Sequence, residues 1–134
     1  MTSNSIMRNI FSSLYSLVKN RNAMNDKDSE LMRIARIVTD CCVSEVRGEK
    51  TFSLEDVIGE SRMENVKMAR TILVCQLLWA GFTYSTIAMF LNRNVSAIRK
   101  IISNHSDYLQ TSRAYRIALS EATIKCKGIE AHGL

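Results

Sequence analysis

Residues 69–100 are ARTILVCQLLWAGFTYSTIAMFLNRNVSAIRK, and this stretch decides the predicted fold. It opens with an apolar helix that Gly81 ends, and a second, short helix begins at Thr83 or Ser85, either of which can cap it. The polar residues Asn92–Asn94 predict a tight turn, and a third helix follows them. A helix, a break, a short helix, a tight turn and a further helix are the parts of a helix-turn-helix unit.

The remainder of the chain also favours helices. Its 134 residues include no proline and five glycines, and apolar residues recur at helical spacing. We therefore expect an all-α fold, a multi-helix bundle of about six helices that contains a helix-turn-helix at residues 83–104. The other helices of the bundle are expected at 28–46, from Ser53, at 63–80 and at 112–125.

The chain divides into three predicted parts. Residues 1–27 hold an amphipathic helix and a polar break, residues 28–127 form the helical domain, and residues 128–134 are a tail. Gly48 is expected to end the first helix of the domain. The N-terminal helix either completes the core of the domain or pairs two subunits, so a homodimer is left open.

The aromatic residues near the helix-turn-helix are interpreted as packing residues. Trp79 and Phe82 are expected in the core around the break, and Tyr84 at the entrance to the second helix of the unit. His105 lies just after the third helix and is expected to be a surface or an end-of-helix residue. The few aromatics left for the surface argue against stacking on single-stranded RNA.

Basic residues are concentrated in the half of the chain that holds the helix-turn-helix. The formal net charge is +5, and residues 1–60 contribute eight Lys or Arg against nine Asp or Glu, a net of −1. Residues 61–127 contribute ten against three, a net of +7, and one Glu in the last seven residues restores the total. This asymmetry favours a phosphate-facing surface, and a solvated basic face without a partner is the alternative.

Several functional classes find no support in the sequence. The four cysteines show no C-x-x-C spacing and form no ligand set with the two histidines, so we expect reduced thiols and no metal site. No paired carboxylates and no nucleophile–base set stand out, so we expect no enzyme, no cofactor and no small-molecule substrate. No apolar run approaches the roughly 18 residues that span a bilayer, and no signal peptide is evident, which favours a cytoplasmic protein without a membrane partner.

Four motifs follow one another in the second and third quarters of the chain: LEDVIG (54–59), SRMENVKMAR (61–70), GFTYSTIAMFL (81–91) and NRNVSAI (92–98). Together they resemble domain IV of the bacterial replication initiator DnaA, in the Trp-repressor-like group of helix-turn-helix folds, over about 45 residues. That domain has a short helix, a basic stretch, a long helix and a turn of the form Gly-Arg-Asp-His-Thr-Thr-Val. The initiator's ATPase motifs do not occur here, so the resemblance implies a regulator or an accessory protein of replication or of a mobile element.

The resemblance also implies which residues contact DNA. Arg70 matches the arginine that contacts DNA beside the helix-turn-helix, and Arg93 matches the turn arginine. Residues 94–97 occupy the positions that read base edges in the family. Val95 and Ala97 lack the family's polar groups there, which implies a different preferred DNA sequence.

The residues of the third helix point to the same surface. Arg99 and Lys100 are expected on its exposed side, where Lys100 would contact a phosphate and Arg99 a guanine edge. Ser96 either contacts DNA or serves the start of the helix, and the sequence leaves both roles open. The predicted DNA-binding residues are Arg70, Arg93, Asn94, Ser96, Ala97, Arg99 and Lys100.

We therefore expect a non-enzymatic, sequence-preferring protein whose partner is double-stranded DNA. The alternative is a protein-interaction module on a helix-turn-helix scaffold, which the apolar residues Val95 and Ala97 favour. The two hypotheses differ in one structural feature. DNA binding requires the exposed residues of the third helix to share a positively charged surface with Arg70.

Overall fold

The computed structural model describes residues 26–128, so the predicted N-terminal helix and the predicted tail beyond Gly128 lie outside the described residues. The all-α, multi-helix prediction is confirmed, with seven helices and one two-stranded hairpin in the described part. In chain order the elements are α2 (Asp26–Cys42), β1 (Glu45–Val46), β2 (Glu49–Lys50), α3 (Leu54–Ile58), α4 (Glu64–Trp79), α5 (Tyr84–Phe90), α6 (Val95–Ser103), α7 (His105–Thr111) and α8 (Arg113–Lys127).

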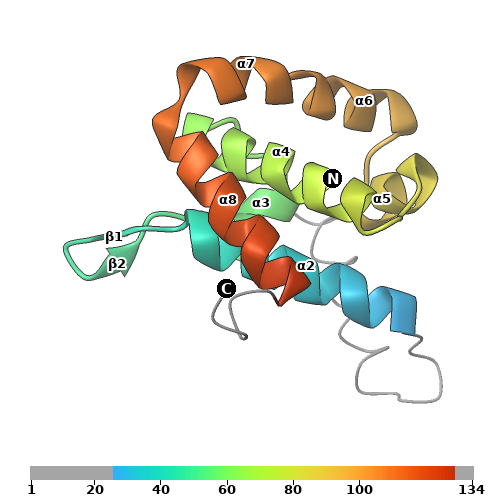
Figure 1. Cartoon of the computed structure of the whole chain (residues 1–134), viewed down its shortest axis with the longest axis horizontal. Coiled ribbons are helices and arrows are strands. Elements are labelled where there is room, and N and C mark those ends of the chain that lie inside the picture. Colours follow the sequence, from blue (N-terminus) through green and yellow to red (C-terminus); the bar gives the residue numbers. More distant parts are fainter. Residues whose placement is uncertain (1–25, 129–134) are drawn as a thin grey trace, which may run out of the picture.

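Helix α4 lies at the centre of the bundle. Figure 1 shows α2 beneath it and α6 followed by α7 above it, while α8 crosses the bundle and packs on both α2 and α4. A helix with neighbours on several sides must be apolar around most of its circumference. Every residue of α4 from Ala69 to Leu77 is accordingly buried. None of the helices in the described range 26–128 has the length and apolar content needed to cross a membrane.

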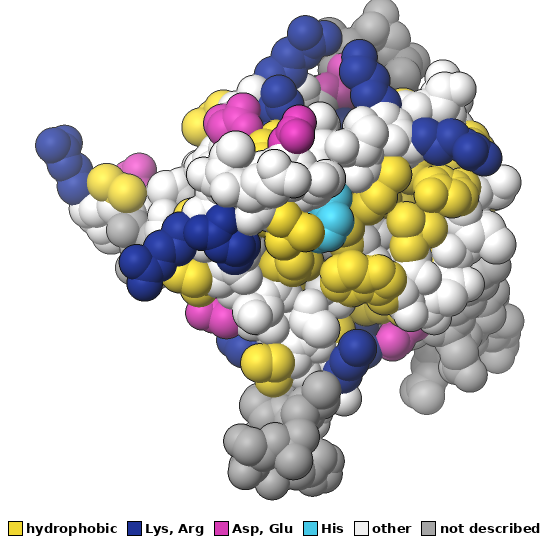
Figure 2. Space-filling model, turned by 45° about the horizontal axis from the view of Figure 1, so that its top comes forward, with side chains coloured by type: hydrophobic (Ala, Val, Ile, Leu, Met, Phe, Trp, Pro, Cys, Tyr) yellow, Lys and Arg dark blue, Asp and Glu magenta, His cyan; other side chains and the backbone are white. Residues whose placement is uncertain are grey.

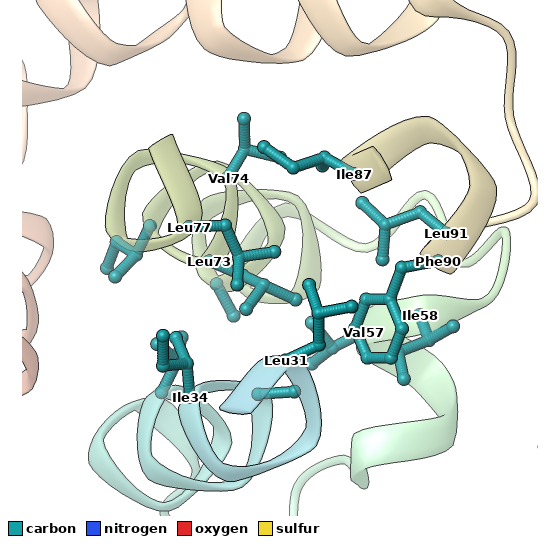
Figure 3. Close-up of a cluster of buried hydrophobic side chains, with 14 of the residues drawn as sticks. Leu31, Ile34, Val57, Ile58, Leu73, Val74, Leu77, Ile87, Phe90 and Leu91 are labelled. Carbon is teal, nitrogen blue, oxygen red and sulfur yellow. The ribbon is translucent and has the colours of Figure 1, made fainter. Parts of the chain in front are cut away.

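The core forms where four helices converge on one cluster of aliphatic side chains. Figure 3 shows Leu31 and Ile34 of α2 and Val57 and Ile58 of α3 facing the side chains of α4 and α5. Burial of each such side chain stabilises the fold by roughly 1.5–3 kcal/mol. The labelled contributions of α4, of α5 and of the C-cap residue of α5 are Leu73, Val74, Leu77, Ile87, Phe90 and Leu91.

The turn between α5 and α6 is built by its backbone. Asn92 has a left-handed φ of 53°, the Arg93 amide donates to the carbonyl of Ala88, and the Asn92 amide donates to that of Met89. This pair of hydrogen bonds is the Schellman motif, which ends a helix and reverses the chain direction within two residues. The predicted turn at residues 92–94 is therefore confirmed.

Polar caps fix the starts of the short helices. Ser53 and Asp56 form a capping box at α3, and Thr83 accepts a hydrogen bond from the Thr86 amide at the start of α5. Of the two caps left open by the sequence, the structure therefore selects Thr83. Gly81, with φ of 100°, ends α4 in a conformation that favours glycine.

The structure corrects the predicted helices in two places. The first helix of the domain ends at Cys42 rather than near residue 46, because Arg47 and Gly48 both have positive φ and form the two-residue turn of the β1–β2 hairpin. Helix α7 was not among the helices predicted from the sequence. Asn104 ends α6 in a helical conformation and the chain continues directly into α7, so the break between the two helices is slight.

Candidate nucleic-acid interface

Helix α6 presents one face to the core and the other to solvent. Ile98 is fully buried, and Val95 packs against the core from the first position of the helix. Ser96, Arg99 and Lys100 are exposed on the opposite side. Val95 therefore has a packing role, and the polar side of α6 remains open to solvent.

Asn94 acts first as the cap of α6. Its side-chain oxygen accepts a hydrogen bond of 2.8 Å from the amide of Ala97, which satisfies one of the free amides at the helix start. The residue is exposed. The amide nitrogen of Asn94 is the part of the side chain that the cap does not use.

Arg99 contacts an aromatic ring of the neighbouring helix. Its guanidinium carbon lies 4.9 Å from the centre of the Tyr84 ring, at the start of α5. A guanidinium over a ring face is attracted by the electron-rich ring, by about 0.5–1 kcal/mol at an exposed site. Tyr84 thus restricts Arg99 to fewer of its rotamers and links the two helices of the unit.

Arg70 is buried rather than displayed. The residue is only 6% exposed. Its guanidinium donates to the carbonyls of Val57 (2.8 Å), Ser61 (3.1 Å), Asp56 (3.1 Å) and Gly59 (2.9 Å). Four of its five N–H groups are therefore committed to carbonyls of α3 and of the α3–α4 connection. The predicted DNA contact at Arg70 is replaced by a structural role, because the carbonyls that end α3 need donors.

Arg93 reinforces the same connection from the helix-turn-helix side. It donates to the carbonyls of Ile58 (3.0 Å) and Leu91 (3.1 Å) and to that of Gly59. Burial lowers the pKa of Arg93, and the nearby Glu60 carboxylate partly offsets this shift. Burial and the charge of Arg93 together lower the pKa of Arg70 to about 10. The two guanidiniums lie close enough to repel each other.

A basic hollow lies between the α3–α4 connection and α6. It measures about 540 Å³, and its lining joins Arg70 and Arg93 with Ala97 and Lys100 of α6. Four of the seven predicted residues therefore meet in one place, whereas Asn94, Ser96 and Arg99 are not among its lining residues. The remaining lining residues are Glu60, Ser61, Arg62, Lys67, Thr71, Ile101 and Asn104.

Arg62 and Lys67 were missed by the sequence-based residue assignment. Both line the hollow, from the connection before α4 and from the first turns of that helix. The signal was present in the motif SRMENVKMAR, whose basic residues precede the buried arginine. Only the fold shows that this basic stretch faces α6.

Trp79 is exposed, and the prediction that it belongs to the core is wrong. Its exposed fraction is 55% because it stands at the last turn of α4, beyond the covering helices. Its ring meets that of His105 edge-on, with centroids 6.1 Å apart. Figure 2 shows hydrophobic side chains gathered around this histidine. Phe82, by contrast, packs against the core as expected.

His105 is half-buried rather than a plain surface residue. Its Nδ1 lies 2.6 Å from the hydroxyl of Tyr115 and 3.3 Å from the sulfur of Cys75. Burial lowers the pKa of His105 and raises that of Cys75 to about 11. A protonated, 2%-exposed thiol is a poor nucleophile, so this contact joins α4, α7 and α8 rather than forming a reactive pair.

The comparisons with known proteins returned no match: the chain corresponds to no family model, to no curated protein and to no solved structure. The similarity to initiator domain IV therefore stays a prediction. Among residues 26–128, no three His, Cys, Asp or Glu side chains are grouped so that they could hold a metal ion.

Proposed function

We propose that the protein binds double-stranded DNA, without catalysis and with a sequence preference, by placing α6 in the major groove. The observation that carries this proposal is the exposed face of α6. Ser96, Arg99 and Lys100 lie on the solvent side of a helix whose start is fixed by the Asn94 cap and whose other face is anchored by Ile98. A short, rigidly held polar helix of this kind has the dimensions that the major groove admits.

The roles of the arginines differ from those that the resemblance implied. Arg99 is the base-reading candidate, since its position over Tyr84 holds the planar guanidinium at the surface. Lys100 and the newly assigned Arg62 and Lys67 would contact the sugar–phosphate backbone. Arg70 serves these contacts indirectly, because it fixes the connection that carries Arg62.

The charge distribution supports the same reading of the surface. The region 61–127 has a net charge of +7, and a basic surface attracts polyanions before any specific contact forms. Such binding releases counterions from DNA and weakens steeply as salt is added. Ala97, which lines the hollow beside Lys100, leaves room at the position where the family has a polar reader. We therefore propose a preferred sequence unlike that of the initiators.

A protein-interaction role is the second candidate, and the exposed Trp79 favours it. Tryptophan is common at the centre of protein interfaces, where a large ring is removed from water. Trp79 lies at the end of α4 beside His105, whereas Lys67 and Lys100 line the basic hollow. The two candidate functions thus use different residues. Substitution at Trp79 tests the protein-interaction role and leaves the cations of the DNA-binding role unchanged.

The test is a selection from a pool of random double-stranded DNA with the full chain. We expect enrichment of one sequence family, and the symmetry of the selected site will show whether one or two copies bind. Arg99→Ala should change the selected sequence at about one or two base pairs. Arg113→Ala, an exposed arginine on α8, is the matched control and should not. Failure of the wild-type chain to enrich any sequence, or to retain duplex DNA at low salt, would overturn the proposal.

A further inference from the structure

We propose that the basic hollow between the α3–α4 connection and α6 is a binding site for a phosphate group. We identify this phosphate as one of the DNA backbone, and that identification rests on the function proposed above. The existence of the site does not, because it follows from charges and contacts within this chain.

A buried cation, Arg70, and a half-buried one, Arg93, share one neutral partner. Arg70 and Arg93 both donate to the carbonyl oxygen of Gly59. All their other acceptors are also backbone carbonyls, in Asp56, Val57, Ile58, Ser61 and Leu91. The ion pairs found among residues 26–128 are Glu30 with Arg33 and Glu64 with Lys67, so neither guanidinium has a carboxylate partner at hydrogen-bond distance.

This arrangement leaves the positive charge of the two guanidiniums only partly compensated, by the Glu60 carboxylate. Carbonyl dipoles satisfy N–H groups but do not neutralise a cation that has lost part of its hydration. The lowered pKa of Arg70 has burial as its main cause and repulsion by Arg93 as its second. Glu60 is the one acidic residue that lines the hollow, and it is exposed to solvent. An anion in the hollow would relieve this repulsion and stabilise the fold.

The rim of the hollow supplies further cationic donors. Lys100 from α6 and Arg62 from the α3–α4 connection are exposed. Lys67 has a loose contact of 3.9 Å with Glu64, and their side chains are 44% and 61% exposed. Such a surface pair is worth little. Arg93 still has N–H groups that its three carbonyl contacts do not use. These donors approach the hollow from different elements.

A phosphate group fits these donors better than a carboxylate does. Its oxygens point in several directions and each accepts strong hydrogen bonds from cations, whereas a carboxylate presents two oxygens in one plane. The hollow also adjoins α6 along Ala97, Lys100 and Ile101. The walls of the major groove are rows of phosphates, about 12 Å apart, so a helix inserted there has a phosphate beside its flank.

The experiment compares thermal unfolding of the full chain in inorganic phosphate and in chloride at equal ionic strength. Phosphate also stabilises proteins non-specifically at high concentration, so the range is kept below about 20 mM. We expect a saturable rise in Tm of roughly 2–5 °C in phosphate. Lys67→Ala combined with Lys100→Ala should remove at least about half of that rise. Lys125→Ala combined with Lys127→Ala, two exposed lysines on α8, should leave it unchanged.

A second variant supplies the negative charge from the chain itself. Ala97→Glu places a carboxylate at the wall of the hollow, so it should raise Tm without phosphate and abolish the response to phosphate. Ser96→Glu is its control, because Ser96 shares the first turn of α6 and its favourable helix dipole but does not line the hollow. Equal effects of the two glutamates would count against the site.

The outcomes separate the site from the proposed function. A wild-type Tm that rises no more in phosphate than in chloride, or that rises equally in the double lysine variant, overturns the phosphate site even if duplex DNA binds. A saturable, lysine-dependent phosphate response in a chain that binds no duplex DNA supports the site and removes DNA as the source of the phosphate.

Discussion

The guanidinium of Arg99 on α6 lies over the ring of Tyr84 on α5, with 4.9 Å between the guanidinium carbon and the ring centroid. The two helices of the helix-turn-helix are thus joined at the surface as well as in the core. Because the contact limits the rotamers of a long side chain, it reduces the entropy that Arg99 would lose on binding a base. Tyr84 is therefore a positioning residue for the base-reading candidate.

Substitution of Tyr84 should change sequence discrimination more than overall affinity. We expect Tyr84→Leu to lower the preference for the selected site over a variant site by roughly 3–10-fold. Tyr84→Phe retains a ring face and should behave like the wild-type chain. Competition between labelled and unlabelled duplexes measures the preference. A loss of preference in the Phe variant equal to that in the Leu variant would contradict the stacking role.

Arg70 should matter for stability more than for direct DNA contact. Arg70→Met removes the guanidinium that donates to the carbonyls of Val57 and Ser61, so we expect a loss of about 2–4 kcal/mol in the free energy of unfolding. Urea denaturation measures this loss. Arg113→Met on the exposed side of α8 should stay within about 0.5 kcal/mol of the wild-type value. A destabilisation at Arg70 no larger than the control would show that the clamp is unimportant.

Asn94 allows capping to be separated from DNA contact. Asn94→Ala should lower the free energy of unfolding by about 1 kcal/mol, because Ala cannot accept from the Ala97 amide. Asn94→Asp keeps an acceptor for the cap and adds a negative charge at the proposed interface. We therefore expect near wild-type stability but weaker duplex binding in the Asp variant. Unchanged affinity in that variant would place Asn94 outside the interface.

His105 should make stability depend on pH in the mildly acidic range. Its folded-state pKa is lowered by burial, so the unfolded chain binds the proton more readily than the folded chain. Stability is then complete above the ordinary histidine pKa of about 6.5 and falls as the pH drops below it. Tm measured between about pH 7 and pH 5 should decline, and less so in His105→Gln.

The second histidine provides the comparison for that measurement. His132 lies outside the described residues, and His132→Gln separates its contribution from that of His105. The pH range from about 7 to 5 lies above the range in which Glu30 gains its proton, since the hydrogen bond from Arg33 lowers the pKa of Glu30. Equal pH dependence in the wild-type chain and in His105→Gln would contradict the assignment.

The helix-turn-helix could be predicted because its signals are local. Asn94 and Thr83 cap helices by reaching amides three residues away, and the polar turn between α5 and α6 needs no distant partner. The hairpin turn at Arg47 and Gly48 was misinterpreted, since the same glycine signal ends helices and closes hairpins. Tertiary contacts, rather than local preference, decide between those two outcomes.

The hollow could not be predicted for a different reason. Arg70 and Arg93 were identified as functional by type and position, but their acceptors lie up to 35 residues away in the chain. Sequence spacing contains no information on which carbonyls lack donors. Trp79 was wrongly predicted to be buried, because helical spacing places it on the apolar face of α4. It is the last residue of that helix, and no neighbouring element buries it there.

DNA binding through the cations of α6 and the hollow is most directly tested by the salt dependence of duplex binding. Fluorescence anisotropy with a labelled duplex gives the binding constant of the full chain at several salt concentrations. With Arg62, Lys67, Arg99 and Lys100 at the backbone and groove, we expect log K to fall with log salt at a slope of about −3 to −4, and Lys67→Ala with Lys100→Ala to reduce the steepness by about 2. A wild-type chain that leaves the anisotropy unchanged at low salt, or that binds with no salt dependence, would contradict the account.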